Sequence, residues 1–217
     1  MVAWSVAALA RADSVGPIVV AAPPGLEEQV GEAARSASVE FSTPEVENST
    51  LDVVEGGQTR AQSVANALEH VGSDIVVIHD AARPLVTPAL IDSVVQKLVD
   101  RPDAAGVIAA APLADTVKRA REPRPAKGEF PRGGPTIAKT ESRDHLWAAQ
   151  TPQAFRVTAL RDALDAADPQ RVAAATDEAM LIEKAGGKVL IEPAPASNLK
   201  VTTAEDLPIA ELLLPRR

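Results

Sequence analysis

The sequence predicts a single α/β domain over residues 1–217, with a mostly parallel sheet covered by helices on both faces. Short, continuously apolar segments such as PIVVAAP, DIVVIHD and AAGVIAAAP alternate with segments whose apolar residues recur at helical spacing. Strands that are buried on both faces are continuously apolar, whereas strands with one solvated face alternate. The chain has 217 residues, of which 46% are hydrophobic, and this is enough to fill one generous core.

Each element follows from this alternation. The predicted strands are rich in β-branched or small apolar residues, and they span residues 17–23, 39–43, 51–57, 74–80, 104–112 and 188–192. The predicted helices have apolar residues every three to four positions, and they span residues 1–10, 25–37, 60–71, 87–100, 157–167 and 176–185. Thr87 can cap its helix, and Pro88 suits the first turn. Residues 197–214 close the chain with a short strand and a helix that has Thr203 and Asp206 in capping-box spacing.

Residues 112–147 interrupt the alternation. Two weakly strand-like pieces, around residues 115–119 and 136–140, flank a tip rich in proline, glycine and arginine. Because a structureless loop of that length is unusual in a compact domain, we expect a projecting β-hairpin arm. Such an arm has no core for its large apolar side chains, which are Phe130, Ile137 and Trp147. We therefore expect a second copy of the chain to cover them, which makes the protein a homodimer.

The composition excludes several classes of function. The 30 acidic and 22 basic residues give a net charge of -8, which argues against partners that are nucleic acids or anionic membranes. The absence of cysteine excludes disulfides, thiolate nucleophiles and thiolate zinc sites. The sequence has neither an apolar segment long enough to span a bilayer nor a signal peptide, so we expect a cytoplasmic protein.

The segment VVEGGQTRAQSV places Gly56 and Gly57 between a predicted strand and a predicted helix, with Ser63 one turn into that helix. Glycines let the backbone approach a ligand closely, and a helix N-terminus offers free amides to a polar or anionic group. The alternative is an ordinary turn from strand to helix. The third glycine of a dinucleotide-binding fingerprint is missing.

The segment VVIHDAARPLV ends a buried strand in His79 and Asp80, at the edge where open α/β sheets bind ligands. Asp80 could hold Mg²⁺ together with phosphate oxygens, and the guanidinium of Arg83 suits a phosphate or carboxylate. The alternative is that Asp80 caps the next turn and Arg83 pairs with a surface acid. We interpret His79 as structural, because one histidine without a second ligand nearby rarely makes a metal site.

Polar residues in later segments complete the candidate set. Each of them has an ordinary interpretation as a cap, a turn residue or a solvated charge, and they are Thr116, Lys118, Arg143, Thr151, Thr176, Asp177 and Lys200.

Six motifs together make the sequence recognisable. GGQTRAQSV, HDAARP, DTVKR, TPQAF, TDEA and NLKVTTAEDL occur in this order with compatible spacing. They resemble the family of 2-C-methyl-D-erythritol 4-phosphate cytidylyltransferases, from Met1 almost to the C-terminus. Ribitol 5-phosphate cytidylyltransferases share most of these motifs and remain an alternative. The resemblance implies a Rossmann-like nucleotidyltransferase of non-mevalonate isoprenoid biosynthesis that uses CTP and Mg²⁺ and releases pyrophosphate.

The resemblance also implies a role for each matching residue. Gly56, Gly57 and Ser63 line the pocket for cytosine and ribose, Asp80 lies beside the metal and the ribose, and Lys200 reaches the CTP phosphates. The sugar phosphate is held by several further residues, some of which the arm of a partner subunit supplies: Arg83, Thr116, Arg143, Thr151 and Thr176.

The sequence departs from the family pattern in two places. Gln58 stands where members often have an acidic residue. Members also begin with a strand and a glycine-rich loop, broadly A-A-G-x-G-x-R with a later P-K, ahead of a segment like VAWSVAAL. Residues 1–217 contain neither, so we expect this chain alone to be marginally stable and to turn over CTP poorly or not at all. A chain that starts too late and a non-catalytic dimeric remnant both fit this expectation.

Overall fold

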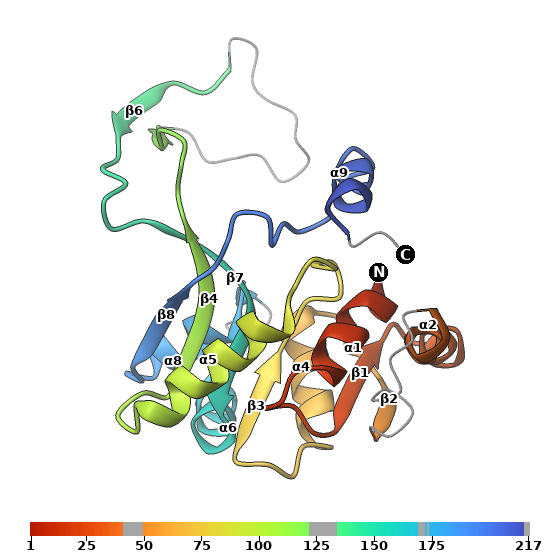
Figure 1. The fold of residues 1–217 in the computed structure, drawn as a ribbon. Coiled ribbons are helices and arrows are strands. Elements are labelled where there is room, and N and C mark those ends of the chain that lie inside the picture. Colours follow the sequence, from red (N-terminus) through yellow and green to blue (C-terminus); the bar gives the residue numbers. More distant parts are fainter. Residues whose placement is uncertain (41–49, 122–133, 169–171, 173, 215–217) are drawn as a thin grey trace.

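The computed structural model describes residues 1–40, 50–121, 134–168, 172 and 174–214, and it has α/β architecture (Figure 1). Four strands form one sheet in the order β3-β7-β4-β8, with bounds β3 Ile75–Ile78, β4 Gly106–Pro112, β7 Trp147–Arg156 and β8 Val189–Pro193. Two parallel strands, β1 Ile18–Ala22 and β2 Leu51–Glu55, form a separate pair. In β1, β3 and β4 the apolar residues form a continuous segment, as expected for strands covered on both faces.

Helices cover both faces of these strands (Figure 1). On one face lie α1 Val2–Ala10, α2 Glu27–Glu40 and α5 Pro88–Asp100. On the other face lie α4 Arg60–Leu68, α6 Val157–Ala166 and α8 Glu178–Lys184, whose apolar side chains share a core with Phe155 of β7. As predicted, the Thr87 side chain caps α5 and Pro88 occupies its first turn. None of the helices in the described part of the chain is long and apolar enough to cross a bilayer.

The sequence interpretation was wrong about three strands. It missed β7, which is the longest strand and runs antiparallel to both β3 and β4. The strand expected at residues 39–43 is wrong for residues 39 and 40, which belong to α2, and residues 41–43 lie outside the described residues. The short strand expected before the last helix is not formed: residues 199–201 have no regular structure ahead of α9 Asp206–Leu213.

The last helix also starts differently from the prediction. Thr203 is not its N-cap, because α9 begins after Glu205. The Asp206 carboxylate nevertheless accepts hydrogen bonds from the backbone amides of Thr202 (2.8 Å) and Thr203 (2.9 Å). Asp206 therefore makes the backbone bond expected of the acidic residue in a capping box, but no threonine side chain caps the helix.

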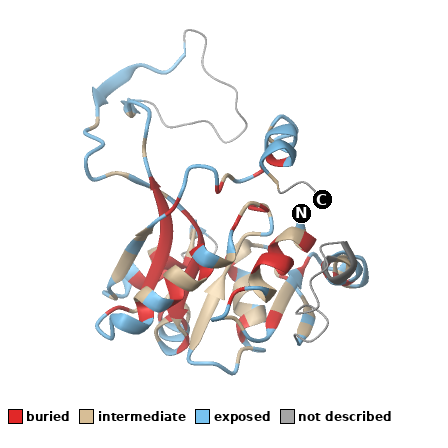
Figure 2. Ribbon diagram, viewed as in Figure 1, coloured by how far each residue is buried: buried red, intermediate tan, exposed pale blue. Residues whose placement is uncertain are grey.

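Between residues 112 and 147, a two-stranded ribbon projects from the body (Figure 1). It consists of β5 Lys118–Ala120 and β6 Ile137–Thr140, which pair antiparallel close to the two strand-like pieces predicted from the sequence. All seven ribbon residues are exposed (Figure 2). Phe130 and the rest of the predicted tip lie outside the described residues.

Candidate active site at the carboxyl edge of the sheet

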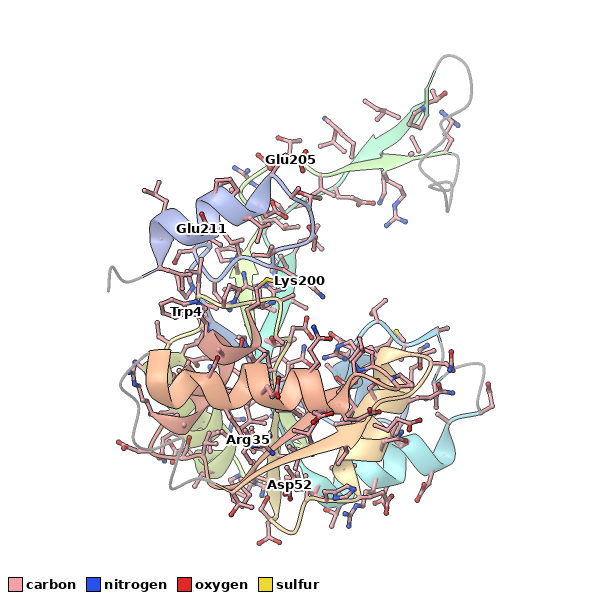
Figure 3. The ribbon with its side chains drawn as sticks, turned by 90° about the vertical axis from the view of Figure 1, so that its right-hand side faces the viewer. Trp4, Arg35, Asp52, Lys200, Glu205 and Glu211 are labelled. Carbon is pink, nitrogen blue, oxygen red and sulfur yellow. The ribbon has the colours of Figure 1, made fainter. Side chains whose placement is uncertain are left out.

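Three segments from distant parts of the sequence meet where β2 and β3 end. Gly56 and Gly57 follow β2, Asp80 follows β3, and Lys200 lies in the segment that connects β8 to α9. Figure 3 shows Lys200 between the body and α9, on the side of Trp4 and at the opposite end from Asp52 near the start of β2. This is the edge at which open α/β sheets bind their ligands.

The Asp80 carboxylate is the centre of a charged cluster. Its Oδ1 accepts a hydrogen bond from Nε of Arg60 at 3.0 Å, and its Oδ2 accepts one from Nζ of Lys200 at 2.9 Å. Burial favours the protonated acid, but the bonds from Lys200 and Arg60 outweigh it and hold the pKa of Asp80 below its ordinary value. Asp80 is therefore ionised at neutral pH, between two cations.

A buried carboxylate holds Arg60 in place. Both oxygens of Glu178, whose side chain is only 1% exposed, accept hydrogen bonds from Nη1 of Arg60 at 2.6 and 2.7 Å. Burial raises the pKa of Glu178, and the adjacent guanidinium opposes this rise. Glu178 is the first residue of α8, and the side chain of Asp177 caps this helix by accepting a hydrogen bond from the amide of Met180. The side chains of Glu178, Arg60, Asp80 and Lys200 thus form, in this order, a continuous line of alternating charges.

The glycine pair is required by local packing. A Cβ atom at Gly57 would lie 2.2 Å from Cβ of Gln62, and one at Gly56 would lie 2.9 Å from the carbonyl oxygen of Ala22. The Ser63 hydroxyl accepts the amide of Gly57 at 3.0 Å and donates to the carbonyl of Thr59 at 3.0 Å. The turn is therefore rigid before any ligand binds. Gln58, the residue that departs from the family pattern, is exposed at this turn.

His79 and Thr151 fix the backbone at Asp80. Because the carbonyl of Arg83 can only accept, Nε2 of His79 donates to it at 3.2 Å, which leaves Nδ1 as an acceptor for the Thr151 hydroxyl at 3.0 Å. The same hydroxyl accepts the backbone amide of Asp80 at 3.0 Å. Burial lowers the pKa of His79 to about 4, so the ring is neutral at physiological pH. The interpretation of His79 as structural agrees with these contacts.

Arg83 lies deeper than the sequence suggested. It is 9% exposed, and its Nη1 donates to the backbone carbonyl of Asn198 at 2.8 Å. The amide of Val201 donates to the carbonyl of Ala82 at 2.8 Å in the same region. These bonds attach the Lys200 segment to the loop after β3. Nε of Arg83 is buried without a hydrogen-bond partner in the described structure, so the guanidinium keeps one free donor.

Within one chain, the predicted site residues do not all meet. Gly56, Gly57, Ser63, Asp80, Arg83, Thr151 and Lys200 lie at the carboxyl edge. Thr116 and Arg143 are exposed and lie at the base of the projecting ribbon, where Arg143 donates to the carbonyl of Ala114. Thr176 is exposed in the turn before α8.

Sequence reasoning missed three residues that build the site. Arg60 and Glu178 both lie in motifs that were recognised, GGQTRAQSV and TDEA, but neither was singled out. Asn198, which is 1% exposed, donates to Gln150 Oε1 at 2.8 Å and to the carbonyl of Thr151 at 2.9 Å. The sequence did contain a signal for Arg60 and Glu178. Each is a charged residue at the start of a helix that packs on the sheet, and charged residues are rarely buried unless they are paired.

A magnesium ion fits this donor set only with help from a ligand. No group of three or more acidic or histidine side chains converges among the described residues. Mg²⁺ commonly uses one or two carboxylates together with substrate phosphates, and Asp80 offers one carboxylate, 16% exposed, at the open edge. Asp80 and bound phosphate oxygens are therefore a chemically adequate set.

The fold and the charged cluster define the class of protein: an open α/β domain with a cluster of charged side chains at the carboxyl edge of its strands, which is the edge where such domains bind their ligands. The chain belongs to the family of 2-C-methyl-D-erythritol 4-phosphate cytidylyltransferases, whose family model (IspD) matches residues 1–216.

Individual relatives agree with this family. The chain is 44% identical over 167 residues to the 2-C-methyl-D-erythritol 4-phosphate cytidylyltransferase of Burkholderia cenocepacia, covering 74% of this chain and 65% of the relative. It is 40% identical over 206 residues to the bifunctional enzyme IspD/IspF of Anaeromyxobacter dehalogenans, covering 95% of this chain and 48% of that protein. The chain thus spans just under two thirds of the first relative and about half of the second.

The fold is similar to solved structures of the same family. The crystal structure of 2-C-methyl-D-erythritol 4-phosphate cytidylyltransferase from Thermus thermophilus matches with a TM-score of 0.72 at 27% identity, covering 97% of this chain and 86% of that one. A crystal structure of a 4-diphosphocytidyl-2C-methyl-D-erythritol synthase matches with a TM-score of 0.73 at 30% identity, covering 99% and 89%.

Proposed function

We propose that this protein transfers the cytidylyl group of CTP to 2-C-methyl-D-erythritol 4-phosphate, in non-mevalonate isoprenoid biosynthesis. The observation that carries the proposal is the line of charges that holds Asp80 and Lys200 at the carboxyl edge, in a chain that belongs to the cytidylyltransferase family. A phosphate oxygen of the polyol attacks the α-phosphorus of CTP, the bond to the β-phosphate breaks, and pyrophosphate leaves. Because CTP is a metabolite of the cytoplasm, the reaction takes place there.

This chemistry needs positioning and charge neutralisation more than a protein base. The attacking phosphomonoester is mostly dianionic at neutral pH, because its second pKa is about 6. Two polyanions must then be held together in line, and preorganised cations stabilise such a transition state. Lys200 is 42% exposed and free to move from Asp80 toward a triphosphate, whereas Arg60 remains fixed by Glu178.

The turn after β2 is our candidate for the nucleoside pocket. Gly56, Gly57 and Ser63 form a rigid turn with the start of α4, which suits the recognition of the cytosine and ribose of CTP. Arg83, Thr151 and Thr176 are our candidates for the phosphate of the polyol. Arg83 has a free buried donor for this purpose, whereas the Thr151 hydroxyl is already engaged with His79 and Asp80.

We further propose that Asp80 holds Mg²⁺ together with the phosphates of CTP. When bound, the ion supplies neutralisation of negative charge on the phosphates. Asp80 suits this role because it is ionised and lies at the open edge of the sheet.

We propose that the arm, residues 112–147, joins two chains into a homodimer. An isolated two-stranded ribbon is marginally stable in water, and Ile137 is 57% and Trp147 39% exposed in the single chain. In a dimer the arm of one subunit can bring Thr116 and Arg143 to the carboxyl edge of the other. Light scattering should show twice the chain mass, and Ile137→Asp should shift it toward the monomer; a wild-type monomer at micromolar concentration contradicts the dimer.

The function is tested by nucleotide binding and by product identification. Calorimetry with Mg²⁺ should show tighter binding of CTP than of ATP, and Asp80→Asn or Lys200→Ala should weaken CTP binding about 10- to 100-fold. Lys188→Ala is the matched control. Lys188 precedes β8 and forms an ion pair (2.6 Å) with Asp103, which precedes β4, so this pair lies at the amino edge of the sheet, opposite the candidate site.

Mass spectrometry after a long incubation detects slow product formation. CDP-methylerythritol should form from CTP and methylerythritol phosphate. Formation of only the ribitol product in a parallel reaction with ribitol 5-phosphate would overturn the substrate assignment, and the absence of any nucleotide preference would overturn the enzyme class.

A further inference from the structure

Two cations contact the Asp80 carboxylate, and they differ in what else holds them. Arg60 donates to Oδ1 of Asp80 at 3.0 Å and to both carboxylate oxygens of Glu178 at 2.6 and 2.7 Å. Lys200 donates to Oδ2 of Asp80 at 2.9 Å, and among the described residues it pairs with no second carboxylate. Arg60 therefore joins two carboxylates, whereas Lys200 is bound to one.

The two carboxylates differ in their access to water. The side chain of Glu178 is 1% exposed, and that of Asp80 is 16% exposed at the open edge. Removal of one partner from a buried ion pair is strongly destabilising, because neither water nor another charge replaces it. Glu178 therefore holds Arg60 firmly. Asp80 can release Lys200 more easily, because Arg60 and water still stabilise its charge.

The main chain around Lys200 is fixed, but its side chain is not. The amide of Val201 donates to the carbonyl of Ala82 at 2.8 Å, and the carbonyl of Asn198 accepts from Arg83 at 2.8 Å. The Lys200 side chain is 42% exposed, and its aliphatic part is flexible. The ammonium group can therefore leave Asp80 while the segment that carries it stays in place.

Stability alone does not account for the pair of Glu178 and Arg60. A buried ion pair contributes little net stability when it is compared with apolar side chains of similar volume. Such side chains would suit this position, because the next residue, Ala179, already belongs to an apolar core. The pair does what apolar side chains cannot do: with Nη1 on Glu178, the planar guanidinium presents Nε to Asp80.

A triphosphate at this edge competes with Asp80 for both cations. Phosphate oxygens form strong, charge-assisted hydrogen bonds with an ammonium group, so they attract Lys200. Arg60 cannot follow without leaving the buried carboxylate of Glu178. The departure of Lys200 leaves Oδ1 of Asp80 on Arg60 and frees Oδ2. One carboxylate oxygen next to phosphate oxygens suits a hard divalent cation.

We propose that Glu178 is a positioning residue of the candidate active site: it keeps Arg60 on Oδ1 of Asp80 while a triphosphate takes Lys200. The Asp80 carboxylate thereby stays in one orientation and offers only Oδ2 at the edge of the sheet. The inference rests on the proposed function, because a nucleoside triphosphate is the ligand that brings the phosphates.

Nuclear magnetic resonance of the wild-type chain tests the difference between the two cations. The probe is inorganic tripolyphosphate without a metal ion. Its addition should shift the side-chain signals of Lys200. The proton on Nε of Arg60 should exchange with water at a rate that changes less than about twofold, because it stays bonded to Asp80. The signals are assigned by their loss in Lys200→Arg and Arg60→Lys.

Glu178→Gln tests Glu178 itself. Glutamine has the same shape, and its carbonyl oxygen still accepts from Arg60, but the negative charge is gone. With tripolyphosphate, the Nε proton of Arg60 should exchange at least about tenfold faster than in the wild type. Tripolyphosphate should also bind at least about threefold more tightly, because a second cation joins Lys200 on the phosphates. A role in stability alone predicts weaker binding.

Glu183→Gln is the matched control. It makes the same substitution in α8, at an exposed position. Both the exchange rate at Arg60 and the affinity for tripolyphosphate should equal those of the wild type. If Glu178→Gln does not fold, the measurement on the wild-type chain still decides the proposal.

Three results overturn the inference. The first is faster exchange at Arg60 in the wild-type chain with tripolyphosphate, because Arg60 then leaves Asp80 together with Lys200. The second is identical behaviour of Glu178→Gln and the wild type, and the third is an absence of any shift at Lys200. CTP that binds no more tightly than ATP, with the expected responses to tripolyphosphate, overturns the proposed function and supports the inference.

Discussion

Strands β4 and β1 are equally apolar in sequence but differ in burial. GVIAAAP of β4 is buried at every position except the last, whereas IVVAA of β1 is buried only at its two ends (Figure 2). Strand β4 has β7 on one edge and β8 on the other, and β1 has only β2 among the described residues. The comparison teaches that the neighbours of a strand, and not its composition alone, decide how far it is buried.

The difference extends to the two regions around these strands. The four-stranded sheet shares one core with α4, α6 and α8 and another with α5, and both contain large side chains that are 0% exposed, such as Phe155 and Leu98. The β1 and β2 pair contributes to a smaller core with α1 and α2, in which Leu51 and Val20 are only partly buried. We expect the β1 and β2 region to open more readily, because local stability follows buried apolar contact and strand pairing.

Hydrogen exchange should show the largest difference between the regions. The amide of Val107 lies in β4, which is paired on both edges, and should exchange only through global unfolding. The amide of Val19 lies in β1 and points away from β2, the one strand paired with β1 among the described residues. We expect Val107 to exchange at least about 1,000-fold more slowly. Comparable rates, measured by nuclear magnetic resonance, would contradict the division into a stable and a labile region.

Truncation of a large side chain in each region sharpens the comparison. Phe155 in β7 is 0% exposed, and Phe155→Ala should reduce the free energy of unfolding by about 3 to 5 kcal/mol. Leu51→Ala in β2 should cost less than about 2 kcal/mol, because Leu51 is only partly buried. Urea titration measures both, and an equal loss would show that the two regions form one cooperative core.

Acid should weaken the four-stranded region through His79. The folded state keeps this ring neutral, since its pKa is about 4, below the ordinary 6.5. Between these values the unfolded chain binds a proton that the folded chain does not, so the free energy of unfolding falls as the pH falls from 6.5 to 4. The loss is at most about 3 kcal/mol, and it is absent above about pH 6.5.

His79→Gln removes this titration and should flatten the dependence of stability on pH over the same interval. His70→Gln is the matched control, because His70 is exposed and takes no part in the hydrogen bonds of His79. Denaturant titrations at a series of pH values give the slopes. A slope that persists in His79→Gln excludes His79 as its source.

The smallest effect concerns the connection between the sheet and Lys200. Asn198→Ala removes the bonds to Gln150 and to the carbonyl of Thr151, and it should reduce stability by about 1 to 3 kcal/mol. Because Asn198 lies two residues before Lys200, CTP binding should weaken as well. A loss of stability with unchanged CTP affinity would show that Asn198 does not position Lys200.

The sequence alone determined most of the elements and the position of the site. Continuous apolar segments predicted β1, β3 and β4, because a strand covered on both faces needs no polar alternation, and short β-branched segments predicted β2 and β8. Gly56 and Asp80, which follow two of these strands, located the candidate site, since the ends of parallel strands share one edge. Local patterns of this kind lie within a few neighbouring residues and can be read without knowledge of the fold.

Only the tertiary structure decided which of these residues meet. Strand β7 was missed because WAAQTPQAFR contains polar residues and a proline, yet Thr151 and Gln153 are buried by bonds to His79, Gln150 and Asp177. The pairing of Glu178 with Arg60 joins residues 118 positions apart. Such contacts depend on the packing of helices and strands that are distant in the sequence, and a pattern of neighbouring residues does not contain them.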